Sequence, residues 1–188
     1  MLRFPNSHAR PRRPLLGFLL LALVAAIAPA QIPEIPDWDG AARFELVSSQ
    51  SAVRPGDRFQ VAVVAELEPG YHLYGPEEPP PTGTVVEFQE TNALQADAAD
   101  YPEPIRRDLS GLGEFDLYEG RVAIRIPLTS SATATDGATE ASVLVRYQLC
   151  TDNACSAPTS TTLALDLPLV ETGADIVPLH TDIFGESR

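Results

Sequence analysis

Residues 143–158 read VLVRYQLCTDNACSAP, and they contain the only two cysteines of the 188-residue chain. Before the first cysteine, apolar and aromatic residues at 143, 145, 147 and 149 alternate with the residues at 144, 146, 148 and 150. This period of two is typical of a β-strand that buries one face. The stretch therefore predicts a strand over residues 143–150, followed by a flexible tip at Thr151–Ala154 that leads to Cys155.

The same alternation recurs along the chain. It predicts strands over Arg58–Ala65, Arg121–Ile126 and Thr162–Leu167, with weaker candidates at Phe44–Ser48 and Thr84–Glu90. Turn-forming runs separate them, and they lie at residues 54–57, 68–70, 79–81 and 119–120. No stretch after residue 30 has a convincing helical period. Short strands separated by turns predict an all-β fold, an immunoglobulin-like antiparallel β-sandwich.

The first thirty residues have the order of a secretory signal peptide. Arginines at positions 3, 10, 12 and 13 precede the apolar run Leu15–Ile27, and Ala28-Pro29-Ala30 forms a small-residue cleavage site. The apolar run is shorter than the roughly 20 residues that span a membrane. We therefore expect an exported, periplasmic protein that is cleaved after Ala30. Retention of the segment as an uncleaved anchor is the alternative.

The remaining chain is predicted to hold an irregular, proline-rich lead-in over 31–41, one domain over 42–170 and a loose C-terminal tail over 171–188. The whole chain has a net charge of −13. Without residues 1–30, nine basic and 26 acidic residues give −17. Nucleic acid and anionic lipid are poor partners for such a chain. All 13 basic residues are arginine, which fits either work at high salt or a GC-rich genome.

The spacing of the two cysteines leaves three interpretations open. A disulfide between them would close a small loop and, as a structural staple, contribute roughly 2 kcal/mol. Together with His72, the two thiols could instead hold a soft ion such as Cu(I), whereas a closed zinc site needs four ligands. A redox pair is the third interpretation. It requires exposed thiols and a bridge of modest stability, and the tip of a hairpin provides that exposure.

The surroundings of the cysteines resemble a known family. Tyr147-Gln148-Leu149-Cys150 and Cys155-Ser156-Ala157-Pro158 are similar to the Y-Q-x-C…C-x-x-P signature of the N-terminal periplasmic domain of the DsbD family of thiol:disulfide interchange proteins. Residues 69–74, PGYHLY, are similar to its P-G-Y-x-L-Y strand, and residues 117–120, LYEG, are similar to its Y-x-G turn. The resemblance spans about residues 42–170.

The resemblance implies a cofactor-free redox pair, Cys150 and Cys155, of which Cys155 binds the client and Cys150 resolves the mixed disulfide. Family members often cap the pair with an aromatic residue, which this resemblance places in the segment Ser110–Phe115. Gly111-Leu112-Gly113 occupies much of that segment, so Phe115 is the nearest candidate. The residues expected to line the site are Tyr71, His72, Tyr74, Phe115 and Gln148.

The roles of four of these residues are left open by the sequence. His72 is either a proton acceptor beside the pair or an ordinary hydrogen-bonded strand histidine. Tyr71 and Tyr74 lie at odd and even positions of the pleat, so only one of them is expected to face the cysteines. Gln148, two residues before Cys150, is either a hydrogen-bonding group across the site or a plain sheet-face residue.

In the family, this domain takes electrons from a membrane-embedded partner domain. It passes them to periplasmic thioredoxin-fold proteins, such as disulfide isomerases and cytochrome c maturation factors. Full-length members continue into a membrane domain and a thioredoxin-like domain, and this sequence continues into neither. We therefore expect a stand-alone module whose donor, a membrane thiol reductase, is a separate chain. The alternative function is an exported immunoglobulin-like binding module whose disulfide only pins a hairpin.

Overall fold

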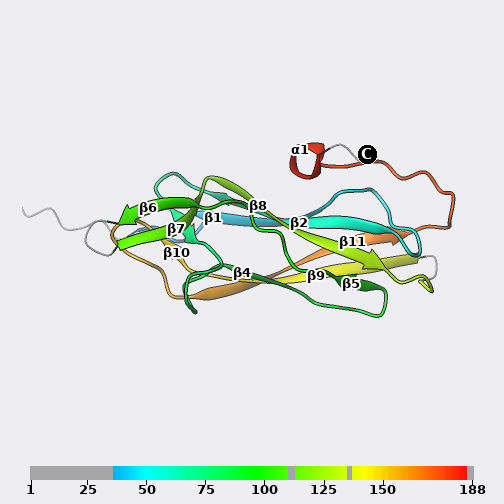
Figure 1. The fold of residues 1–188 in the computed structure, drawn as a ribbon, viewed down its shortest axis with the longest axis horizontal. Coiled ribbons are helices and arrows are strands. Elements are labelled where there is room, and N and C mark those ends of the chain that lie inside the picture. The colour runs from blue at the N-terminus through cyan, green and yellow to red at the C-terminus, as the bar shows by residue number, and fades with distance from the viewer. Residues whose placement is uncertain (1–35, 110–112, 135–136, 186–188) are drawn as a thin grey trace, which may run out of the picture. The chain divides into compact units, whose positions relative to one another are not determined.

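The computed structural model describes residues 36–109, 113–134 and 137–185. Every paired strand in this part of the chain is antiparallel to its neighbour. The elements, shown in Figure 1, are β1 (Ala42–Ser48), β2 (Arg58–Leu67), β3 (His72–Tyr74), β4 (Val85–Phe88), β5 (Leu94–Ala96), β6 (Ile105–Leu109), β7 (Gly113–Glu119), β8 (Arg121–Ser130), β9 (Gly137–Tyr147), β10 (Leu149–Cys150), β11 (Thr159–Leu169) and the one-turn helix α1 (Thr181–Phe184). Within these described ranges, no helix is long and apolar enough to cross a membrane.

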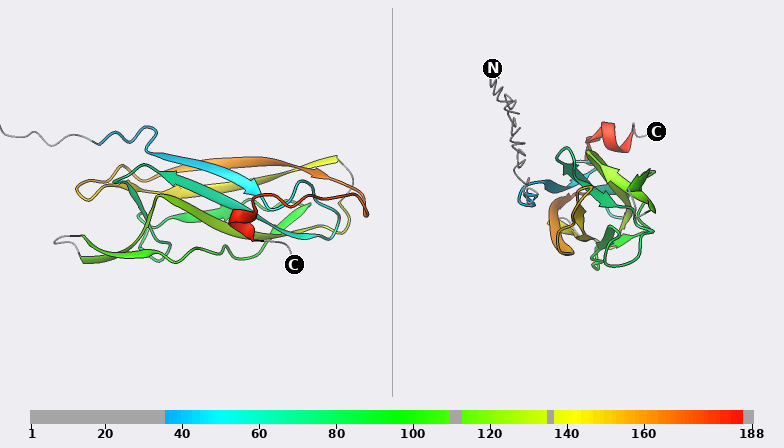
Figure 2. Two further views of the ribbon diagram at one scale, coloured as in Figure 1. Left: turned by 90° about the horizontal axis from the view of Figure 1, so that it is seen from above. Right: turned by 90° about the vertical axis from the view of Figure 1, so that its left-hand side faces the viewer.

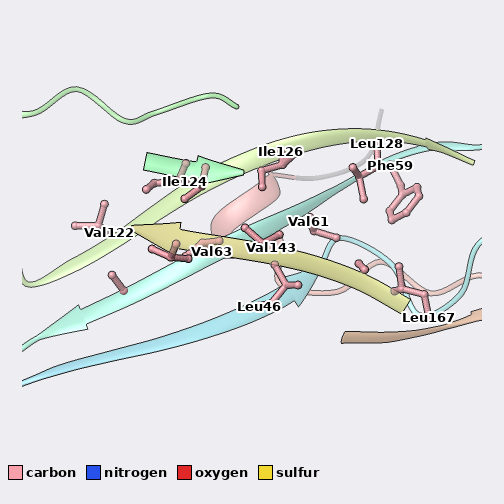
Figure 3. Close-up of a cluster of buried hydrophobic side chains, with 14 of the residues drawn as sticks. Leu46, Phe59, Val61, Val63, Val122, Ile124, Ile126, Leu128, Val143 and Leu167 are labelled. Atoms are coloured by element: carbon pink, nitrogen blue, oxygen red, sulfur yellow. The ribbon is translucent and has the colours of Figure 1, made fainter. Parts of the chain in front are cut away.

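Two sheets enclose the main hydrophobic core. One has the strand order β1-β2-β8-β5 and the other β11-β9-β4. Alternate side chains of β2 and β8, among them Val61, Val63 and Ile126, are fully or almost fully buried and meet Val143 of β9 (Figure 3). Viewed along the strands, the elements of the domain surround this core (Figure 2, right). The prediction of an all-β, immunoglobulin-like sandwich is confirmed.

A third sheet, ordered β10-β3-β7-β6, carries the first cysteine. Its two faces contact different clusters, because neighbouring residues in a strand point to opposite sides. Leu73, Tyr118 and Leu149 belong to the main core. Tyr74 and Cys150 belong to a second, smaller cluster on the opposite face. We call this second group the cysteine cluster, and its members are Tyr74, Leu109, Leu117 and Cys150, with Phe115 packed against them.

The prediction of one continuous strand over residues 143–150 is wrong, because the strand is interrupted. β9 ends at Tyr147 and pairs with β11, whereas β10 begins at Leu149 and pairs with β3. At Gln148 the chain passes from one sheet to another, so the simple alternation stops there. As a result Leu149 and Cys150 are both buried, one in each cluster.

The C-terminal segment is not the loose tail that the sequence predicts. After β11 the chain turns back along the domain to α1 (Figure 2, left). The Ser51 amide donates to the carbonyl of Val177 at 2.9 Å, and the Leu179 amide donates to the carbonyl of Ser49 at 2.8 Å. Ile183 and Phe184 pack on a small apolar patch formed by Val47, Ala62 and Val64. The segment docks because it covers apolar residues on the outer face of β1 and β2.

The predicted signal peptide, residues 1–30, and the first part of the lead-in lie outside the described residues. The end of the lead-in contacts the domain. The ring of Trp38 meets that of Tyr71 edge to face, with centroids 5.9 Å apart, and Ala41 is buried in the main core.

Candidate redox site

Cys150 and Cys155 form a disulfide at the end of the third sheet. Their Cα atoms are 4.0 Å apart, and the two residues oppose one another in an antiparallel bridge. The tip between them, which the sequence predicts to be flexible, is a hydrogen-bonded turn in this structure. The Thr151 amide donates to the carbonyl of Ala154 at 2.8 Å, and the Thr151 hydroxyl oxygen accepts from the Asn153 and Ala154 amides at 3.3 and 3.2 Å.

Hydrogen bonds also close the base of this hairpin. The Gln148 side-chain amide donates to the carbonyl of Ser156 at 2.8 Å. The Ser156 amide donates to the carbonyl of Leu149 at 2.8 Å, and the Leu149 amide donates to the Ser156 hydroxyl at 3.2 Å. These bonds hold Ser156, and with it the neighbouring Cys155, against β10.

The two cysteines differ sharply in exposure. Cys150 is 0% exposed, because β3 pairs with its strand and the cysteine cluster packs on its side chain. Cys155 is exposed. An incoming thiolate can therefore reach Cys155 from solvent, whereas Cys150 is shielded.

His72 lies directly beside the disulfide in the sheet. One register row runs from Cys155 to Cys150, from Cys150 to His72, and from His72 to Glu119. Residues directly opposed in antiparallel strands place their side chains on the same face. His72 is 1% exposed, and among the described residues its Nε2 atom has no hydrogen-bond partner.

Burial and nearby charges shift the pKa of His72 in opposite directions. Burial lowers the pKa of His72 and is the largest influence, because it disfavours the charged ring. The negative charges of Asp152 and Glu119 raise it, and the positive charge of Arg107 lowers it. The net effect on this pKa is a decrease below its usual value, which favours the neutral imidazole.

Aromatic and aliphatic side chains make the surroundings of Cys150 apolar. The ring of Tyr74 lies between those of His72 and Phe115, with centroid distances of 5.6 and 5.5 Å and edge-to-face geometry. Burial, followed by the nearby Glu78 carboxylate, raises the pKa of the Tyr74 hydroxyl. Leu109 and Leu117 complete the cluster. Aromatic and aliphatic side chains thus enclose Cys150 on the face of the sheet opposite the main core.

An arginine absent from our sequence predictions joins the turn to the neighbouring strands. Arg107 of β6 binds the carboxylate of Glu119 on β7, and its second terminal nitrogen lies 3.2 Å from each carboxylate oxygen of Asp152. Asp152 stands between the two cysteines. Sequence reasoning could not find this contact, because 45 residues separate Arg107 from Asp152 and no periodic pattern relates them.

The structure brings most of the residues predicted to line the site together, but not all of them. His72, Tyr74 and Phe115 lie around Cys150, and Gln148 bonds across the hairpin base. Tyr71 lies apart from the cysteine cluster. It packs against the main core, and its hydroxyl donates to the carbonyl of Asp37 at 2.8 Å. Positions 110–112 of the predicted cap lie outside the described residues. Leu109, which the sequence did not single out, belongs to the cysteine cluster.

No group of three or more histidine, cysteine, aspartate or glutamate residues within 36–109, 113–134 and 137–185 could hold an ion.

Comparison with known proteins gives one family and several distant structures. Residues 43–167 match the family "Thiol:disulfide interchange protein DsbD, N-terminal". The N-terminal periplasmic domain of ScsB from Proteus mirabilis is 18% identical, with 71% of this chain and 49% of that chain covered and a TM-score of 0.46. This chain thus spans about half of that ScsB structure. The reduced DsbD N-terminal domain of Neisseria meningitidis is 15% identical, with coverage of 71% and 90% and a TM-score of 0.38.

A structure of the complex between the DsbD and PilB N-terminal domains of Neisseria meningitidis is 16% identical, with coverage of 63% and 80% and a TM-score of 0.41. No curated protein matches the chain. The family match includes both cysteines and extends from β1 into β11. Because it covers more than half of the sequence, the chain belongs to the family of DsbD N-terminal domains and contains a thiol:disulfide interchange domain with the disulfide Cys150–Cys155.

Proposed function

We propose that this domain relays electron pairs, through Cys150 and Cys155, from a membrane thiol reductase to thioredoxin-fold proteins of the periplasm. The observation that carries the proposal is the disulfide at a hairpin tip with one exposed and one buried cysteine. Thiol–disulfide exchange begins when a thiolate attacks one sulfur and the other sulfur leaves. The exposed Cys155 is the sulfur to be attacked, and Cys150 is the leaving group.

Loading of the domain takes two steps. A thiolate of the donor attacks Cys155 Sγ, the bond between the two cysteines breaks, and Cys150 Sγ leaves and takes up a proton. The second thiol of the donor then attacks the mixed disulfide and releases Cys155. The donor dithiol becomes a disulfide, and the domain gains two electrons and two protons.

Delivery reverses this order on the client. Cys155 attacks the client disulfide and forms a mixed disulfide. Cys150 then attacks Cys155 Sγ, and the client leaves with both cysteines reduced. The hydrogen bonds across the hairpin base support this scheme, because they hold Cys150 next to Cys155 during resolution.

The same proposal places the protein in the periplasm. We propose that residues 1–30 direct its export and are removed after Ala30. The basic start, apolar run and small-residue site of this segment support that role. Mass spectrometry of the protein recovered from the periplasm tests it, and a mature N-terminus other than Gln31 would contradict the cleavage site.

Redox titration tests the relay. The folded domain is equilibrated with mixtures of reduced and oxidised dithiothreitol, and the fraction of free thiol is measured. We expect a reduction potential above about −300 mV, the value below which structural disulfides lie. A Cys150→Ala/Cys155→Ala double variant has no thiols and gives the background of the free-thiol measurement. A bridge that stays closed at more negative potentials would instead identify an immunoglobulin-like module with a structural disulfide.

Transfer to a client is measured separately. The reduced domain is mixed with an oxidised periplasmic disulfide isomerase, and free thiols on both proteins are alkylated and counted over time. We expect the client to gain two thiols as the domain loses two. If the measured reduction potentials of the two proteins favour transfer and none occurs, the proposed class of client is wrong.

A further inference from the structure

The Nε2 atom of His72 is a buried polar group without a partner among the described residues. Such atoms are rare in folded proteins, because an unmade hydrogen bond in an apolar site costs free energy. The position of His72 suggests why it is left free. Its cross-strand neighbour is Cys150, whose sulfur is bonded to Cys155 in this state.

A disulfide sulfur has no hydrogen to donate. Reduction changes this, because Cys150 then carries an S–H group and its side chain is released from Cys155. Cβ atoms of directly opposed residues in antiparallel strands lie about 4.5–5.5 Å apart. Rotation of the freed Cys150 side chain can therefore bring its sulfur within hydrogen-bonding reach of the His72 ring.

We propose that His72 Nε2 is the proton acceptor for the Cys150 thiol. In the reduced domain it accepts a hydrogen bond from Cys150 Sγ–H. During resolution it takes that proton, and the Cys150 thiolate then attacks Cys155 Sγ of the mixed disulfide. The client thiolate leaves and is protonated by solvent, and the proton on His72 is later returned to solvent. The kinetic part of this inference rests on the proposed function.

The groups around His72 suit this role. The ring of Tyr74 packs edge to face against the imidazole, and burial lowers the pKa of His72, which keeps the imidazole neutral and so able to accept a proton. Glu119 from β7 and Asp152 from the turn are negative charges that stabilise the imidazolium once it forms. Arg107 binds both carboxylates and holds them in place.

Nitrogen NMR of the histidine rings tests the hydrogen bond without any partner protein. Two variants isolate the two states: Cys155→Ala leaves a permanent Cys150 thiol, and Cys150→Ala leaves none beside the ring. We expect the His72 Nε2 resonance of Cys155→Ala to match that of the reduced wild type and to differ from that of Cys150→Ala. Exposed His180 is the internal control and should be the same in all samples. Identical Nε2 resonances in the two variants would overturn the inference.

Kinetics test the proton transfer. The mixed disulfide of Cys155 with glutathione is prepared, and the rate at which Cys150 resolves it is followed against pH. General acid–base catalysis typically contributes about 10²- to 10⁴-fold, so His72→Gln should slow this step by at least about tenfold near neutral pH. Tyr71→Phe changes a tyrosine that lies apart from the cysteine cluster and should retain the pH profile of the wild type.

The two proposals fail differently. A reduction potential in the structural range would remove the relay, and the NMR comparison would still report on the hydrogen bond. Conversely, the domain could have a reduction potential above about −300 mV and yet resolve the mixed disulfide at equal rates in the wild type and in His72→Gln. That result would overturn the role of His72 and leave the relay in place.

Discussion

Arg107 and Asp152 join the edge strand β6 to the turn between the two cysteines. A terminal nitrogen of Arg107 lies 3.2 Å from each carboxylate oxygen of Asp152, and its other terminal nitrogen binds Glu119. Glu119 opposes His72 in the sheet. One guanidinium thus contacts both acidic groups that flank the buried histidine, and it ties the turn to the body of the domain.

Replacing Arg107 by methionine is expected to loosen the turn. Methionine keeps much of the apolar stem of the side chain but removes both ion pairs. Amides of residues 151–154 should then exchange faster with deuterium, because the turn keeps only its internal hydrogen bonds. The difference from the wild type should narrow at about 1 M salt, where exposed charge pairs are screened.

Arg106→Met is the matched control. Arg106 neighbours Arg107 and pairs with Glu114 at 3.9 Å and Asp116 at 3.5 Å, both on β7 and away from the turn. Its removal should leave exchange at residues 151–154 unchanged. Equal protection of these amides in Arg107→Met and the wild type would show that the turn does not depend on the ion pair.

The order of attack is tested by trapping. Cys150→Ser leaves only the exposed cysteine, so we expect it to accumulate a stable mixed disulfide with an oxidised client. Cys155→Ser leaves only the fully buried cysteine and should trap little or none. Non-reducing gels followed by mass spectrometry give the amounts. Stronger trapping by Cys155→Ser would reverse the assignment and require the cluster around Cys150 to open.

Tyr118 provides a test of the sheet that supports the site. Its side chain is 3% exposed, and its hydroxyl donates to the carbonyl of Pro102 at 2.9 Å. Burial raises the pKa of Tyr118 to about 12, with further contributions from Tyr101, Asp116 and Glu103. Since the folded state disfavours the phenolate, the free energy of unfolding should fall as pH rises from about 10, the unfolded value, to about 12.

Tyr118→Phe separates this contribution from other alkaline effects. The variant should lose about 1 kcal/mol at neutral pH, because the hydrogen bond is removed. It should also lose stability less steeply than the wild type above pH ~10. Urea unfolding at a series of pH values measures both. Parallel pH profiles for the two proteins would show that Tyr118 ionises normally in the folded state.

Sequence periodicity predicted the strands that bury one face along many residues. β8 and β11 follow their alternation, whereas β2 is buried on both faces over residues 61–65, because the C-terminal segment covers its outer face. β3 is different, because it has only three residues and all are buried. β6 reads IRRDL and is mostly exposed, so it has too little apolar pattern to predict a strand. Short or charged strands are determined by their neighbours, and periodicity does not detect them.

The residues of the candidate site also fall into two groups: those that local sequence motifs identify and those that only strand pairing brings to the site. Local motifs identified Cys150, Cys155, His72 and Tyr74, because these residues stand in short segments that resemble the family. Arg107 and Leu109 reach the site from β6, whose position depends on its pairing with β7. A single sequence does not specify that pairing. Contacts made by distant side chains across the sheet required the structure.

Docking of the C-terminal segment can be broken at one residue. Phe184 packs on the patch formed by Val47, Ala62 and Val64. Phe184→Asp should detach α1 and lower the free energy of unfolding by roughly 1–2 kcal/mol, less than for a fully buried phenylalanine. Val177→Asp, at a position that is 58% exposed, is the control and should have little effect. Deuterium exchange at the Ser51 amide, which donates to Val177, reports detachment directly; unchanged exchange in Phe184→Asp would contradict the docking.

Added salt is expected to stabilise this acidic chain. The chain has a net charge of −13, and the paired arginines of the described domain, at positions 54, 106, 107, 121, 125 and 146, occupy only some of its carboxylates. Salt weakens both the attraction within these pairs and the repulsion among the remaining acids. Exposed pairs contribute little, whereas the excess negative charge repels itself throughout the compact state. Added salt should therefore remove more repulsion than attraction, and the free energy of unfolding should rise.

We expect the melting temperature to rise between about 0.1 M and about 2 M potassium chloride, because the screening length shrinks to about 3 Å at 1 M. A Glu77→Gln/Glu90→Gln/Glu103→Gln variant separates screening from general salting-out. These three glutamates are exposed and form no ion pair within the described residues. The variant should melt higher than the wild type at low salt and gain less from added chloride. A melting temperature that stays constant over this range would assign the absence of lysine to genomic base composition instead of adaptation to salt.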